Sequence, residues 1–151
     1  MANTQAMCTS FKGKLLVGHH NFGTGVTRGS TAADTFKAAL YLASATVNAT
    51  TTAFSATNEV SGTGYTTGGV TVTFGTAPST SGTTAFVTPS ASISFTTVTL
   101  STAFDAVLIY NRTQSNKAVS VHPFGSQTVT AGTFTLTMPT NDASTGLIRI
   151  A

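Results

Sequence analysis

Residues 134–138 read Phe-Thr-Leu-Thr-Met, an alternation of apolar residues with threonine that decides the fold class. The same alternation recurs at 70–74, Val-Thr-Val-Thr-Phe, and a variant of it occurs at 147–150, Leu-Ile-Arg-Ile. Successive side chains of a β-strand point to opposite faces, so this alternation indicates strands with one face on a core. The polar partner is almost always threonine, so the outer surface is predicted to be nearly uncharged.

The composition favours a single β-domain built for assembly. Only 7% of the 151 residues are charged, against about 25% in an average soluble domain. Thr and Ser together make up about a third of the chain, biased towards Thr, which favours strands. A chain of this length supports one modest core. Ten phenylalanines argue against disorder of the whole chain.

Short apolar or alternating segments recur between turn residues at intervals of about ten residues, as in a β-sandwich or jelly roll. Residues 106–110, Ala-Val-Leu-Ile-Tyr, lack polar alternation and are predicted to form the central strand, covered on both faces. We expect turns over 77–82, and strands over 35–42, 70–74, 85–88, 92–95, 106–110, 118–121, 127–130, 133–138 and 146–150.

The predicted fold is therefore all-β, an antiparallel β-sandwich or jelly roll with a short N-terminal helix or arm. Residues 1–34 are expected to form the N-terminal arm and linker, and 35–151 a single β-sandwich domain. Within the arm, 9–16 is the only credible helix, and an extended arm is the alternative because Gly13 weakens it.

The charged residues predict neither a nucleic-acid nor a membrane partner. The net charge of +3 rests on scattered Lys and Arg residues, whereas nucleic-acid binding usually needs a concentrated basic patch. Residues 1–7 lack the basic and apolar regions of a secretory signal. No apolar run approaches the ~18 residues of a membrane-spanning helix. We expect synthesis in a cytoplasm, without export.

Residues able to carry catalysis or bind a metal are few. The carboxylates form no recognisable catalytic pair in sequence. His19 or His20 with His122 suggest a metal site, but adjacent histidines on an extended segment point to opposite sides and no cysteine or carboxylate cluster completes the set. Cys8 has no obvious base beside it and is expected to be a passive thiol. We expect no enzymatic activity, no metal and no other cofactor.

Several short motifs follow one another in a specific order along nearly the whole chain. They are 9–16, Thr-Ser-Phe-Lys-Gly-Lys-Leu-Leu, with His20 and Phe22; 35–41, Thr-Phe-Lys-Ala-Ala-Leu-Tyr; 58–69, Asn-Glu-Val-Ser-Gly-Thr-Gly-Tyr-Thr-Thr-Gly-Gly; 108–111, Leu-Ile-Tyr-Asn; and 147–150, Leu-Ile-Arg-Ile. In this order they resemble a group of small virion structural proteins of tailed bacteriophages, similar to capsid cement or decoration proteins. The chain departs from that pattern at Lys14, where such sequences often carry an acid.

The resemblance implies a protein of the virion capsid, assembled in the host cytoplasm, that binds the major capsid protein and stabilises the shell by bridging its subunits. It also implies a homo-oligomer, a dimer or trimer, because multivalent attachment raises avidity. The expected contacts lie in the arm, roughly 2–22, and in Gly-rich loops near Tyr65 or Phe86. The contact residues are Phe11, Lys12, Lys14, Leu15, His20, Phe22, Tyr65 and Phe86.

Two other function classes stay in play. A tail, adaptor or fibre component could carry a host-surface carbohydrate-binding module, although the absence of Trp counts mildly against sugar binding. A hydrolase of unfamiliar type would need polar groups that converge with perturbed pKa values, and nothing in the sequence calls for one.

Overall fold

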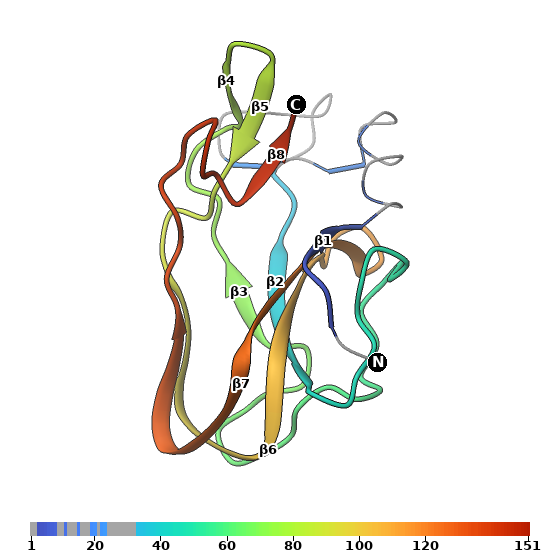
Figure 1. Cartoon of the computed structure of the whole chain (residues 1–151), viewed down its shortest axis with the longest axis vertical. Coiled ribbons are helices and arrows are strands. Elements are labelled where there is room, and N and C mark those ends of the chain that lie inside the picture. The colour runs from blue at the N-terminus through green and yellow to red at the C-terminus, as the bar shows by residue number, and fades with distance from the viewer. Residues whose placement is uncertain (1–2, 9–10, 12–14, 16–18, 21, 24–32) are drawn as a thin grey trace.

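The structure is a computed structural model that describes residues 3–8, 11, 15, 19–20, 22–23 and 33–151. Its strands form two antiparallel sheets (Figure 1), one of five strands in the order β1-β7-β6-β2-β3 and one of three in the order β4-β5-β8. The strands are β1 (Ala6–Met7), β2 (Phe36–Leu42), β3 (Val70–Val72), β4 (Ser79–Ser81), β5 (Thr84–Val87), β6 (Ile93–Asn111), β7 (Lys117–Leu136) and β8 (Ile148–Ile150). The predicted all-β antiparallel sandwich is confirmed. The short helix or arm expected over 9–16 lies mostly outside the described residues.

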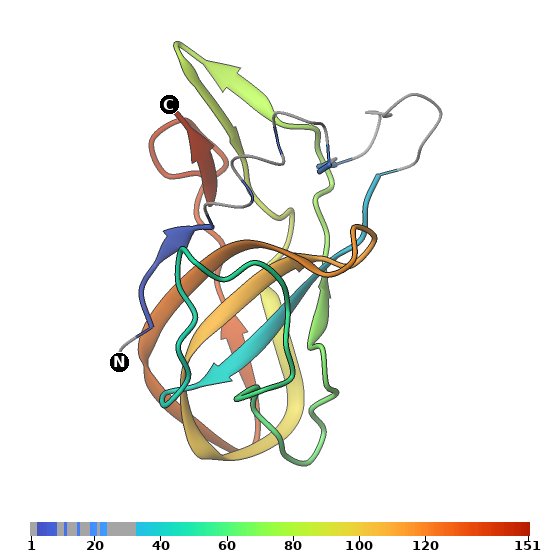
Figure 2. The same ribbon diagram turned by 90° about the vertical axis from the view of Figure 1, so that its right-hand side faces the viewer.

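Strands β6 and β7 form one long antiparallel hairpin that folds back on itself (Figures 1 and 2). Phe95 of β6 pairs with Phe134 of β7. In a straight strand, Phe104 would lie about 30 Å from Phe95 at ~3.3 Å per residue. The rings of Phe104 and Phe134 are nevertheless only 5.1 Å apart. The two halves of this hairpin therefore face each other across the core.

Bulges allow the hairpin to bend. The register between β6 and β7 shifts repeatedly between Phe95 and Ala106, and Thr97 and Ala131 have positive φ angles of 54° and 46°. An extra residue in one strand of a pair bends and twists that strand. The separate strands expected over 92–95, 106–110, 118–121, 127–130 and 133–138 are thus joined into β6 and β7, because residues that resemble turns form bulges within continuous strands. The turn expected over 77–82 likewise contains β4.

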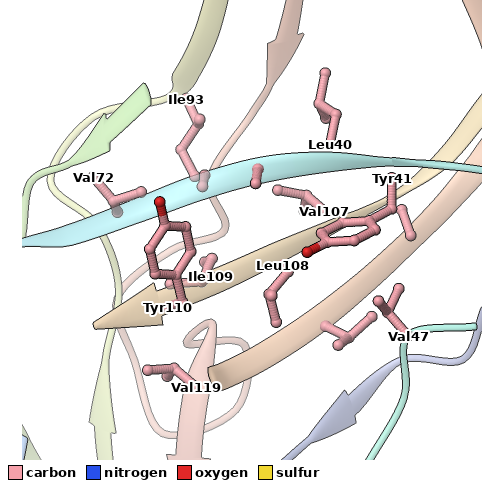
Figure 3. Close-up of a cluster of buried hydrophobic side chains, with 14 of the residues drawn as sticks. Leu40, Tyr41, Val47, Val72, Ile93, Val107, Leu108, Ile109, Tyr110 and Val119 are labelled. Atoms are coloured by element: carbon pink, nitrogen blue, oxygen red, sulfur yellow. The ribbon is translucent and has the colours of Figure 1, made fainter. Parts of the chain in front are cut away.

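The segment 106–110 is the central strand, as predicted. It belongs to β6, which lies between β7 and β2, and its residues are at most 2% exposed. Figure 3 shows Leu108 and Tyr110 of this segment on the same side of the sheet as Tyr41 of β2, and Leu40 on the other side. The loop 43–58 helps to cover the sheet, since the ring of Phe54 stacks on Tyr110 with centroids 4.7 Å apart.

The part of the hairpin formed by 93–104 and 118–136 contains no Asp, Glu, Lys or Arg, as the threonine alternation predicts. No Asp, Glu, Lys or Arg occurs between Glu59 and Asp105, or between Lys117 and Asp142. Hydroxyl side chains pair across the strands, with 3.1 Å between Ser94 Oγ and Thr135 Oγ1. The exposed hydroxyl residues of this half of the hairpin include Ser94, Thr96, Thr128, Thr130, Thr133 and Thr135.

Candidate interaction surface

An apolar pocket of about 160 Å³ lies between the N-terminal segment and the three-stranded sheet. Strand β8 pairs with β5 so that Ile148 is opposite Val87 and Ile150 is opposite Ala85. Because side chains alternate along a strand, these four share one face and form a continuous apolar wall. The residues lining the pocket are Phe11, Leu15, Phe22, Pro78, Ala85, Phe86, Val87, Ile148 and Ile150.

Ile150 lies at the edge of this pocket and is 45% exposed. It is the one large hydrophobic side chain that is exposed among the residues the structure describes. A single exposed apolar residue is ordinary, but one that is continuous with an apolar pocket extends the surface that a partner could bury.

Four of the predicted contact residues come together at this pocket: Phe11, Leu15, Phe22 and Phe86. Phe11 and Phe22 are 0% and 5% exposed, so they line it from within the core. The Phe22 ring stacks on Phe36 at 4.8 Å. Phe86 is 9% exposed. That these rings contact a partner directly stays a prediction. Such contact would require the buried rings to lose some of their present contacts within the core.

The other predicted contact residues do not line the pocket. Lys12 and Lys14 lie outside the described residues. His20 is buried beside Phe11, with ring centroids 4.7 Å apart. Tyr65 is half-buried in the Gly-rich loop that lies against β2. The eight residues therefore divide between the pocket, two buried polar networks and the part of the chain that is not described.

The first polar network joins the N-terminal segment to the turn of the β6–β7 hairpin. Asn111, which is 0% exposed, lies with its Nδ2 3.0 Å from His20 Nδ1 and donates to Asp34 Oδ2 at 2.7 Å. The backbone N–H of Gln114 donates to Asn111 Oδ1 at 3.0 Å. An amide that bonds three segments at once fixes their relative positions, because each unmade bond would leave a buried polar group unsatisfied.

The second polar network holds the Gly-rich loop on β2. Glu59 is 8% exposed, and its Oε1 accepts hydrogen bonds from the Tyr65 hydroxyl at 2.8 Å and from the Gly68 N–H at 2.7 Å. The Tyr65 hydroxyl in turn accepts from the Leu40 N–H at 3.0 Å. Burial raises the pKa of Glu59, while the bonds from Tyr65 and Gly68 act to lower that pKa.

Gly69 explains why this loop is rich in glycine. Its φ is +68°, and a Cβ atom there would lie 1.7 Å from the carbonyl oxygen of Ala38. Only glycine fits so close to a neighbouring backbone at a positive φ. The sequence shows the glycines and the tyrosine, but the spacing from Glu59 to Tyr65 is no known signal of a hydrogen-bonded pair.

The groups considered for chemistry have separate structural roles. His122 lies with its Nε2 2.8 Å from Ser120 Oγ, and burial lowers its pKa to about 4. Cys8 is 0% exposed, and burial raises the pKa of its thiol to about 11, so the thiol is protonated at neutral pH. Asp142 accepts from the backbone N–H groups of Ser144 and Thr145 in a turn. Across the described ranges, no three His, Cys, Asp or Glu residues gather as metal ligands would.

No family model, curated protein or solved structure was found to match this chain. The described part of the chain also holds no helix with the length and hydrophobicity that crossing a bilayer requires. The features that bear on function are therefore the pocket, the uncharged surface and the order of the sequence motifs.

The residues that sequence reasoning missed at this surface are Pro78, Ala85, Val87, Ile148 and Ile150. The alternation in 147–150 identifies a strand, but nothing local says which strand it pairs with. The wall of the pocket exists only because β8 returns to β5 from more than fifty residues away, a non-local contact that no short motif encodes.

Proposed function

We propose that this chain is a non-enzymatic structural protein of a tailed-bacteriophage virion, and specifically a capsid cement or decoration protein. It binds the major capsid protein on the outside of the shell and bridges neighbouring subunits. The observation that carries the proposal is the apolar pocket with Ile150 at its edge, set in a chain whose surface is largely uncharged and rich in threonine. The order of the sequence motifs supports the same assignment.

These surface properties suit adhesion to a protein shell. Covering an uncharged hydroxyl surface leaves no unpaired charge in the interface, so the desolvation cost is modest. An apolar anchor beside that surface supplies buried area, which is the main favourable term in protein association. A weak contact of this kind is sufficient when many copies act on one shell.

The copy number in purified particles tests the proposal. Quantitative mass spectrometry should compare this chain with the major capsid protein, on intact virions and on separated heads. A copy number of the same order as the shell protein, retained on heads, is expected. A small multiple of three, six or twelve that is lost with the tail would instead assign the chain to an adaptor or fibre.

The pocket itself is tested by Ile150→Asp, with Thr57→Asp as the control because Thr57 is exposed in a loop away from the pocket. Particles that lack the chain are incubated with purified wild type or variant, and bound protein is measured. Ile150→Asp should weaken binding about tenfold or more, which corresponds to ~1.4 kcal/mol, while Thr57→Asp should bind like wild type. Equal binding by both variants would exclude the pocket as the contact.

A further inference from the structure

One edge of β7 is covered only along its first part. The backbone of the loop 52–54 bonds to this edge at Asn116 and Ala118, and β1 pairs with Ser120 and Val121. From residue 122 to residue 136 this edge has no strand partner within the described ranges. Backbone N–H and C=O groups along such an edge form a template for another strand.

This open stretch is long compared with the strands at the ends of the two sheets. Those strands, β1, β3, β4 and β8, have two or three residues each. Natural edges are commonly protected by lysine or proline. Pro123 stands at the start of this edge, but residues 124–136 contain neither lysine nor proline and no charged residue.

The regular part of this edge is at its end. Bulges near Ala131 distort the preceding residues, but Phe134, Thr135 and Leu136 pair one-for-one with Phe95, Ser94 and Ile93. The side chains of Thr133 and Thr135 are exposed, while Phe134 packs inward against Phe104. An incoming strand would therefore find an extended backbone flanked by threonine hydroxyls.

A second copy of this chain fits the edge better than a charged partner. Antiparallel pairing about a twofold axis places the same stretch opposite itself. Because the stretch is uncharged, this pairing opposes no like charges and buries no unpaired charge. Threonine pairs across strands are favourable, and the Ser94–Thr135 contact shows hydroxyl pairing already in use within the hairpin.

We propose that two copies of this chain pair antiparallel through the β7 edge at 132–136, which makes a continuous sheet across a twofold dimer. This surface is separate from the apolar pocket and does not depend on the proposed capsid function. The edge becomes paired in the dimer, so dimer formation also removes an exposed strand edge, which is prone to aggregation, from solvent.

The test is the solution mass of the purified full chain, measured by sedimentation velocity over a wide range of concentration. The wild type should reach twice the 15.3 kDa of one chain. Thr133→Lys combined with Thr135→Lys places like charges opposite each other and should raise the dissociation constant of the dimer about tenfold or more. The control, Thr57→Lys combined with Ser61→Lys, adds the same charge at exposed loop positions and should dimerise like wild type.

Hydrogen exchange provides a second readout of the same pairing. The backbone amides of 132–136 should exchange more slowly at concentrations where the dimer forms, and those of the loop 57–61 should not change. A monomer at every concentration, a trimer, or a dimer insensitive to the lysines at 133 and 135 would overturn the proposal. If the wild type is a monomer and only the edge variant fails to bind particles, the edge pairs with a strand of the capsid protein instead.

Discussion

Replacement of Phe22 by alanine tests whether the N-terminal segment belongs to the core. The ring is 5% exposed, stacks on Phe36 at 4.8 Å, and meets Phe74 edge-on at 5.0 Å and Phe11 at 5.8 Å. Truncation of a buried phenylalanine to alanine costs about 3–5 kcal/mol, because transfer energy is lost and a cavity is left. For a domain of this size the melting temperature should fall by roughly 6–20 °C.

The measurement is urea unfolding followed by circular dichroism, with Thr4→Ala as the control because Thr4 is exposed in the same segment. The control should stay within about 0.5 kcal/mol of wild type. A loss below ~1 kcal/mol for Phe22→Ala would refute the reasoning, since it would mean that the ring does not pack in the core in solution. If Phe22 packs in the core, deletion of residues 2–22 should unfold the domain. If it does not, the same deletion should leave a folded domain.

Three further outcomes are expected. Burial lowers the pKa of His122 from 6.5 to about 4 in the folded state. The contribution of His122 to the free energy of unfolding is therefore fully present above pH 6.5 and is lost as the pH falls, by about 2 kcal/mol at pH 5. His122→Gln should remove this pH dependence from the stability measured by urea unfolding. Burial raises the pKa of Glu59, so its protonation favours the folded state and the free energy of unfolding should increase as the pH falls through the folded pKa. The difference in stability between wild type and Glu59→Gln should therefore change with pH in the direction opposite to that for His122. A change in the same direction would contradict this expectation. Cys8 should react with a thiol reagent at pH 8 only as fast as the protein unfolds, and rapid labelling of the native protein would show that the segment opens locally.

Alternation of apolar and polar residues identified most strands, because the side-chain period of a strand is a local property. The unbroken apolar run at 106–110 also identified the central strand, since only a strand covered on both faces avoids polar residues. The folding back of the β6–β7 hairpin was not predictable in this way. Small or polar residues such as Ser101 and Gly125 resemble turn residues, and the same residues also occur where the strand register shifts within a continuous strand.

The role of residues 3–22 was harder to predict for a different reason. Phe11 has one periodic partner, Leu15, and Phe22 has none, and the residues next to both phenylalanines are polar or glycine, which favoured a short helix or arm. In the structure Phe22 packs on Phe36 and Phe74, which come from distant parts of the chain, and Phe11 packs on Phe22. The burial of an isolated aromatic residue depends on such non-local contacts, so its sequence neighbourhood alone carries little information about it.

The two proposed surfaces have a joint consequence. The pocket is built from β5, β8 and the N-terminal segment, whereas the dimer edge belongs to β7, so one copy could use both at once. A dimer with two pockets would bind a repeating shell through linked contacts, and the second contact would form at a high effective concentration. The edge variant with lysine at 133 and 135 should then weaken particle binding while its pocket stays intact. A covalent dimer of two edge-variant chains, joined by a flexible linker, should recover part of that affinity, because the linker then replaces the lost pairing.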